Sequence, residues 1–190
     1  MNKTLLAAAL IASFGIAAFA PQAARAANTS SGTITFNGTL TASTCTVAVN
    51  GSTSSLAVTL PTTPLVDGVL GASGNSAGWT PVTLTLSGCT GLNGYTKVYP
   101  YFQGGIDSTT GYLTNTGSAT NVEVALSNKQ DLNTGDPLTL QNTSGNQNAG
   151  TQLLSASTPT FSYYAGYVAN GGAAGAGSVT ASVTYSLNYQ

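Results

Sequence analysis

The sequence contains no histidine and very little charge. Lys, Arg, Asp and Glu together make up 5% of the 190 residues. Histidine is the commonest general base and metal ligand in proteins, so its absence removes most acid-base and zinc chemistry. The few carboxylates stand singly in turn-like contexts such as Val66-Asp67-Gly68, and do not form the pairs that a glycosidase uses. The sequence therefore predicts no enzyme, no metal site and no cofactor.

Positive charge is the scarcest feature. Lys3 and Arg25 lie in the first 26 residues, so the rest of the chain carries only Lys97 and Lys129 against five carboxylates. Binding to nucleic acid or to an anionic membrane surface depends on clustered Lys and Arg. We therefore expect neither of these partners, and no small-molecule substrate.

The chain also lacks an apolar run long enough to span a membrane. The run from Leu5 to Ala20 is shorter than the ~20 apolar residues that a spanning helix needs. Lys3 precedes this run, and Ala24-Arg25-Ala26 offers a cleavage site of the small-x-small kind. We predict that residues 1–26 are a secretory signal peptide, with a membrane anchor as the alternative.

Cysteine is rare as well. The two cysteines, Cys45 and Cys89, both follow the predicted signal peptide. An even count in an oxidising compartment favours one disulfide over two free thiols. This disulfide would close a loop of about 45 residues, which stabilises a fold by roughly 4 kcal/mol in the chain-entropy model.

The remaining sequence is rich in Thr, Ser, Asn and Gly, and apolar residues recur in it at every second position. The clearest internal runs cover residues 82–86, 122–126 and 161–167, and turn signals separate them. Side chains of a strand point alternately to its two faces, so these runs predict β-strands. Short strands at such intervals, without a helical period of useful length, predict one β-sandwich domain.

The strongest alternation runs from Gly177 to Gln190. At about 3.3 Å per residue, a strand of this length would extend roughly 40 Å. No later residue of the sequence can pair with it, so an earlier strand or another molecule must cover its edge. One face of the segment carries only apolar residues, namely Val179, Ala181, Val183, Tyr185, Leu187 and Tyr189.

A second alternating segment lies near the start of the chain. Gly32, Ile34, Phe36, Gly38 and Leu40 share one face. Glycine weakens the interior of a strand unless another backbone or a pocket must come close. The alternative interpretation is an ordinary first edge strand with a turn at its second glycine.

Together these features resemble the pilin subunits of chaperone-usher fimbriae, in particular the type 1 and P-like rod subunits. The resemblance rests on the segment from Gly32 to Gly38, on the spacing of Cys45 and Cys89, and on a C-terminal motif with penultimate Tyr189. It covers the whole chain after the predicted signal peptide. The low charge of this sequence departs from the better-known rod subunits.

The resemblance implies an all-β fold. It would be an incomplete immunoglobulin-like sandwich that lacks its last strand and is completed by a donor strand from a neighbouring subunit or a chaperone. Residues 27–38 would form an N-terminal extension that acts as the donor strand, and residues 39–190 the pilin domain. The donor residues would be Gly32, Ile34, Phe36 and Gly38. The acceptor groove and chaperone contact would comprise Gly177, Val179, Val183, Tyr185, Leu187 and Tyr189.

The resemblance also implies a function and its partners. The chain would be a structural subunit of an adhesive surface fimbria, exported through the periplasm and polymerised by donor-strand exchange. Its partners would be identical or related pilin subunits in a linear homopolymer, a periplasmic chaperone and an outer-membrane usher. The alternatives are a minor fimbrial subunit, or a carbohydrate-binding adhesin that uses Trp79 and some of the nine tyrosines to stack on sugars.

Overall fold

The structure is a computed structural model that describes residues 44–190, except 53, 56, 64, 66, 67, 93 and 157. These residues all lie in one of two compact units of the chain, the unit that spans Leu40–Gln190. The predicted signal peptide and the predicted donor residues Gly32, Ile34, Phe36 and Gly38 lie outside the described residues. The predicted boundary between the extension and the domain stays a prediction.

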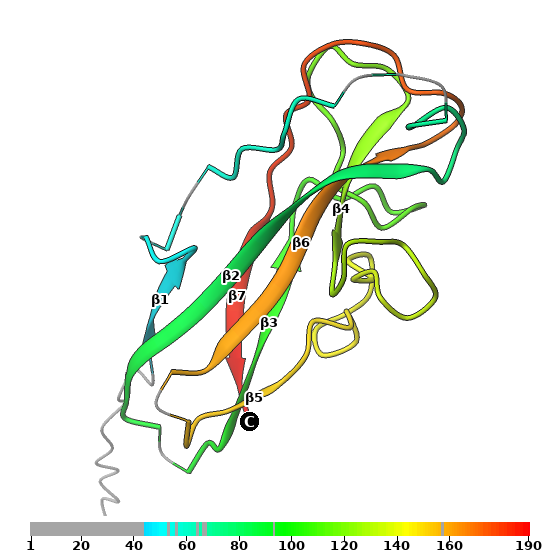
Figure 1. Ribbon diagram of the computed structural model, residues 1–190. Helices are drawn as coiled ribbons and strands as arrows, with labels where there is room; N and C mark the ends of the chain where they lie inside the picture. The colour runs from blue at the N-terminus through cyan, green and yellow to red at the C-terminus, as the bar shows by residue number, and fades with distance from the viewer. Residues whose placement is uncertain are drawn as a thin grey trace, which may run out of the picture. The chain divides into compact units, whose positions relative to one another are not determined.

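Two antiparallel sheets contain all the strands of the described residues (Figure 1). The first sheet has the order β1 (Thr44–Val49), β2 (Ser76–Thr90), β6 (Thr160–Ala169), β4 (Val122–Ser127). The second has the order β5 (Gln152–Leu153), β3 (Lys97–Gln103), β7 (Thr184–Tyr189). No described residue is helical, so the predicted all-β class is confirmed. It follows that the described part of the chain holds no helix long and apolar enough to cross a membrane.

The long pair of β2 and β6 supplies the first sheet's central contribution to the core. Their register runs from Ser76 opposite Val168 to Thr85 opposite Thr160. The period-two alternation turns Leu84 of β2 and Tyr163 of β6 inward, where both are buried. Tyr163 meets Phe102 of β3 edge to face, with ring centroids 5.6 Å apart, and this contact joins the two sheets. The hydrophobic core therefore lies between the sheets, as in a sandwich.

The predicted disulfide is confirmed. Cys45 of β1 and Cys89 near the end of β2 are bonded, with their Cα atoms 4.1 Å apart. The register between these strands shifts beside Cys45, between Thr44 and Thr46. The disulfide therefore fixes β1 to the edge of the first sheet at the end where β2 finishes, which we call the disulfide end.

The strand β3 is continuous through Pro100, although proline cannot donate a ladder hydrogen bond. In an antiparallel pair, each residue directs its N–H and C=O to one neighbour only, and successive residues alternate sides. Phe102 directs both groups away from β7, and Pro100, two residues earlier, faces the same side. On that side β5 pairs only with Lys97 and Val98, so the proline interrupts no ladder bond.

The side chain of Gln147 takes the place of a strand partner for Phe102. Its Oε1 accepts a hydrogen bond from the Phe102 N–H at 2.8 Å, and its Nε2 donates to the Phe102 carbonyl at 2.8 Å. The same Nε2 donates to the carbonyl of Leu140 at 2.7 Å. A buried amide thus covers the edge of β3 where no strand runs.

Candidate functional site: a groove along the edge of the sandwich

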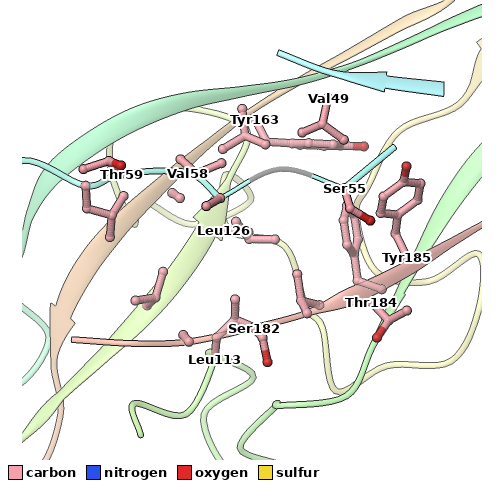
Figure 2. A pocket seen from close by; sticks show the side chains of 18 of the residues that line it. Val49, Ser55, Val58, Thr59, Leu113, Leu126, Tyr163, Ser182, Thr184 and Tyr185 are labelled. Carbon is pink, nitrogen blue, oxygen red and sulfur yellow. The ribbon is translucent and has the colours of Figure 1, made fainter. Parts of the chain in front are cut away.

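A cavity of about 970 Å³ runs along one edge of the sandwich, and we call it the groove. Its first rim is the end of β1 and the chain that follows, comprising Val49 and residues 54, 55 and 57–60. Its second rim is residues 179–185, which lead into β7. In Figure 2, Val58 and Thr59 of the first rim lie across the cavity from Ser182 of the second. The floor consists of core residues, namely Leu84, Phe102, Leu113, Val124, Leu126, Tyr163 and Ala165.

The second rim keeps the alternation that the sequence predicted. The apolar residues at alternate positions from Val179 to Tyr189 all pack against the core, but each of them is only partly buried. Core residues of β2 and β6, such as Leu84 and Phe161, are almost fully buried. A sandwich that lacks one strand leaves this kind of half-covered row, because no side chains close over it from the open edge.

The second rim is shorter as a strand than the sequence predicted. β7 pairs with β3 only from Thr184, opposite Gln103, to Tyr189, opposite Val98. Before Thr184 the chain bonds instead to residues 115–119, since the Thr116 N–H donates to the carbonyl of Thr180 at 2.8 Å. The prediction of one strand from Gly177 to Gln190 is therefore wrong in its first half. The reason is that β3 ends at Gln103, where two glycines with positive φ turn the chain away.

The two rims are not joined by backbone hydrogen bonds between described residues. β7 is an edge strand, paired with β3 alone among the described strands. Because alternate residues of β7 bond to β3, the backbone groups of Tyr185 and Leu187 face the open edge. The groove therefore offers unpaired strand backbone beside a row of partly buried apolar side chains.

Two tyrosine hydroxyls of the C-terminal segment make hydrogen bonds to the chain around β1 near the disulfide end. The Tyr185 hydroxyl donates to the carbonyl of Ser54 at 2.8 Å. The Tyr189 hydroxyl accepts a hydrogen bond from the Cys45 N–H at 3.1 Å. The rims thus run in opposite directions. The Tyr185 bond closes the groove at its disulfide end, and the Tyr189 bond lies beyond it. Burial raises the pKa of Tyr185, so its hydroxyl is protonated at neutral pH and can donate this bond.

The predicted acceptor residues separate into two groups. Val179, Val183 and Tyr185 line the groove, together with Ala181, which was not among them. Leu187 and Tyr189 pack against the core nearer the disulfide end and do not line it. The role of all these residues as acceptor and chaperone contact stays a prediction.

Gly177 does not line the groove. A Cβ on this residue would come within 2.7 Å of the Cα of Ala119 and of the carbonyl carbon of Ser118. Glycine is therefore needed where two chain segments cross closely, rather than at the groove itself. The predicted role of Gly177 in the acceptor site gains no support from this position.

Sequence reasoning missed the first rim as part of the site. Val58 and Leu60 did show a strand-like alternation, but in the structure residues 57–60 form no ladder. Both side chains are partly buried and line the groove. The alternation was a signal for one buried face, although not for pairing.

The groove is lined by apolar and hydroxyl-bearing side chains. Among the described residues that line it, none carries a charge, and no described cluster of His, Cys, Asp and Glu could hold a metal ion. An apolar trough beside a strand edge suits an extended chain whose alternate side chains are apolar.

Trp79, the residue suggested for sugar stacking, lies against β6. A Cβ on Gly166 would come within 2.5 Å of the indole ring, so the glycine makes room for Trp79. One face of the indole is therefore occupied by the protein, and the side chain is only partly exposed.

Comparison with known proteins identifies the family. Residues 34–190 match the family described as fimbrial protein. The chain is 36% identical over 165 residues to the F17 fimbrial protein of Escherichia coli, covering 84% of this chain and 87% of that one. It is 38% identical over 174 residues to the major fimbrial subunit SMF-1 of Stenotrophomonas maltophilia, covering 86% and 95%.

Among solved structures, the CupB6 tip adhesin of Pseudomonas aeruginosa shows a TM-score of 0.44 at 15% identity, over 61% of this chain and 31% of that one. This likeness is too loose to identify a fold. The family match and the sandwich with one open edge agree with the predicted fold, an incomplete immunoglobulin-like pilin domain. The chain thus belongs to the fimbrial protein family, the pilin subunits of chaperone-usher fimbriae.

Proposed function

We propose that this chain is a structural subunit of an adhesive surface fimbria that polymerises by donor-strand exchange. The observation that carries the proposal is the groove, where a row of only partly buried apolar side chains lies along the unpaired edge of the second rim. A strand that enters such a site gains main-chain hydrogen bonds, while its alternate side chains enter the apolar trough. The N-terminal extension of a neighbouring subunit is the strand that fits.

The pattern of the extension supports this pairing. Ile34 and Phe36 stand on one face of the segment, with Gly32 and Gly38 on either side of them. The segment 32–38 has the same number of residues as the part of the second rim that lines the groove, 179–185. Full burial of Ile34 and Phe36 contributes about 1.5–3 kcal/mol each by transfer from water.

The proposal includes assistance before assembly. An empty groove exposes apolar side chains and a strand edge, and both promote aggregation. A periplasmic chaperone lends a strand to the groove after export directed by residues 1–26, and an outer-membrane usher then receives the subunit. The uncharged lining supports binding of another chain rather than catalysis, so the subunit is not an enzyme.

The role in the fibre is that of a main structural subunit. The relatives named a fimbrial protein and a major fimbrial subunit match over most of their own lengths, 87% and 95%. A repeating subunit needs a donor segment and an acceptor groove in the same chain, and this chain combines both features. Adhesion is then a property of the assembled fibre.

The test compares surface material from cells that express the chain with its assembly partners. We expect thin fibres in electron micrographs, and an SDS-resistant ladder of multimers that boiling dissolves. Phe36→Asp should abolish both, because a charged side chain cannot enter the apolar groove. Thr35→Asp is the matched control, since it places the same charge on the opposite face of the segment and should leave fibres intact. Normal fibres from Phe36→Asp would refute the proposal.

A further inference from the structure

Large hydrophobic side chains are exposed at only three positions among the described residues. They are Leu65, Tyr95 and Leu153, which are 44%, 46% and 55% exposed. Leu153 is the partner of Lys97 in the pair of β5 and β3, and Tyr95 precedes Lys97 by two residues. Tyr95 and Leu153 therefore both lie beside the first residue of β3, at the same end of the second sheet, and we call them the root patch.

The root patch and Leu65 lie at opposite ends of the domain. The Tyr95 ring is 6.4 Å from the ring of Tyr189, whose hydroxyl binds the Cys45 N–H at the disulfide end. Leu65 lies in the connection before β2, which starts at the other end. The carbonyl of Gly68 in that connection accepts a hydrogen bond from the Asn75 side chain, next to the first residue of β2. In Figure 1 the connection before β2 is at the top, whereas β5 and the C-terminus are at the bottom.

The end at which a donor segment leaves the groove determines which ends of two neighbouring subunits meet in a polymer. The hydrogen bond of Tyr185 to Ser54 closes the groove at the disulfide end, and that of Tyr189 to Cys45 lies beyond it in the same direction. A donor segment that is still attached to its own domain therefore leaves the groove at the far end. This direction also makes it antiparallel to the second rim, the more stable kind of pairing.

The connection between the donor segment and its domain is short. A chain spans at most ~3.6 Å per residue, so the residues between Gly38 and Cys45 reach at most about 25 Å. Since Cys45 lies at the disulfide end of its own domain, that end is held beside the far end of the neighbour. The root patch and Leu65 are the exposed apolar side chains of these two ends.

We propose that the root patch of one subunit packs against Leu65 of the next copy of this chain, forming a second contact beside the inserted strand. The proposal rests on the donor-strand exchange proposed above. The two surfaces differ, so the contact is head to tail and repeats along an open fibre. Its area is small, so it fixes the angle between neighbouring subunits while the donor strand holds them together.

Cross-linking tests the contact in assembled fibres. Both natural cysteines are bonded to each other, so Leu65→Cys with Leu153→Cys provides the only thiols. A short bis-maleimide should convert fibres of this double variant into a ladder that survives boiling. Each single variant should give no ladder. Leu65→Cys with Tyr101→Cys, which places the second thiol midway along β3, should give none either.

Two outcomes would overturn the contact while leaving the proposed function in place. One is fibres of the Leu65→Cys and Leu153→Cys variant that form normally but give no boiling-resistant ladder. The other concerns Tyr95→Ser with Leu153→Ser, whose fibres should assemble but bend more sharply between subunits in electron micrographs. Unchanged bending would contradict the proposal. Absence of fibres from the wild type would instead refute donor-strand exchange itself.

Discussion

Gln147→Leu removes the side chain that covers the edge of β3. The change leaves the Phe102 N–H, the Phe102 carbonyl and the Leu140 carbonyl without their partner, at a site where Gln147 is 1% exposed. Each buried polar group that loses its partner costs about 1–3 kcal/mol, so the three together cost at least about 3 kcal/mol. Leucine has nearly the volume of glutamine, so little of this loss comes from a cavity.

Urea unfolding measures this cost directly. We would follow the fluorescence of Trp79, the single tryptophan, in subunits whose groove is filled by a saturating peptide copy of residues 28–40. With a denaturant slope of about 1–3 kcal/mol per M, the midpoint should fall by about 1–3 M. Gln130→Leu makes the same change at an exposed position and should cost no more than about 0.5 kcal/mol. Equal midpoints for the two variants would refute the role given to Gln147.

Three further predictions concern the groove and its surroundings. Tyr185→Phe removes the hydroxyl hydrogen bond to the Ser54 carbonyl, which is worth about 0.5–1.5 kcal/mol. Donor peptide should therefore enter the groove about 2–10-fold faster in stopped-flow mixing. An unchanged rate would show that this hydrogen bond does not close the groove. Burial raises the pKa of Glu123, so its stabilising contribution is complete below about pH 4.3 and is lost as pH rises through the folded-state pKa. Glu123→Gln should therefore reduce the loss of stability to urea as pH rises. Parallel pH profiles of the wild type and the variant would contradict this role of Glu123. Gly177→Ala should lower the free energy of unfolding by about 1–3 kcal/mol through overpacking. Gly71→Ala, whose Cβ would have its nearest contact at 3.5 Å, should not lower it. Similar free energies of unfolding for the two variants would argue against the close crossing at Gly177.

The local features of this fold could be predicted from the sequence. The alternation at residues 122–126 and 161–167 predicted strands, and β4 and β6 contain these runs. Period two is a local signal, and it is strong where one face of a strand is buried. The disulfide between Cys45 and Cys89 could be predicted on a different ground, because two cysteines allow only one pairing.

Features that depend on distant partners could not be predicted. Gln147 stands in a polar segment that reads as a loop, and nothing nearby marks this amide for burial. Its burial depends on the unpaired edge at Phe102, 45 residues earlier. In the same way, the start of β7 at Thr184 depends on where β3 ends, at Gln103.

The groove could be predicted only in part. The apolar face from Val179 to Tyr185 is one continuous segment, so its alternation identified the second rim. The first rim and the floor come from segments far apart in the sequence, such as Val58 and Leu113. The groove exists because no strand fills the space between the rims, and no single stretch of the sequence shows that a strand is missing there.

The hydrogen bond between Cys45 and Tyr189 has a consequence for the order of folding, because it joins residues 144 positions apart. Synthesis proceeds from the N-terminus, so all four strands of the first sheet exist before β7 does. The second sheet is completed, and the second rim is joined to it, only by the six residues of β7. Contacts of such long sequence separation form slowly, because a large loop must close first. The same six residues therefore determine both when the domain can finish folding and when it first has a groove to fill.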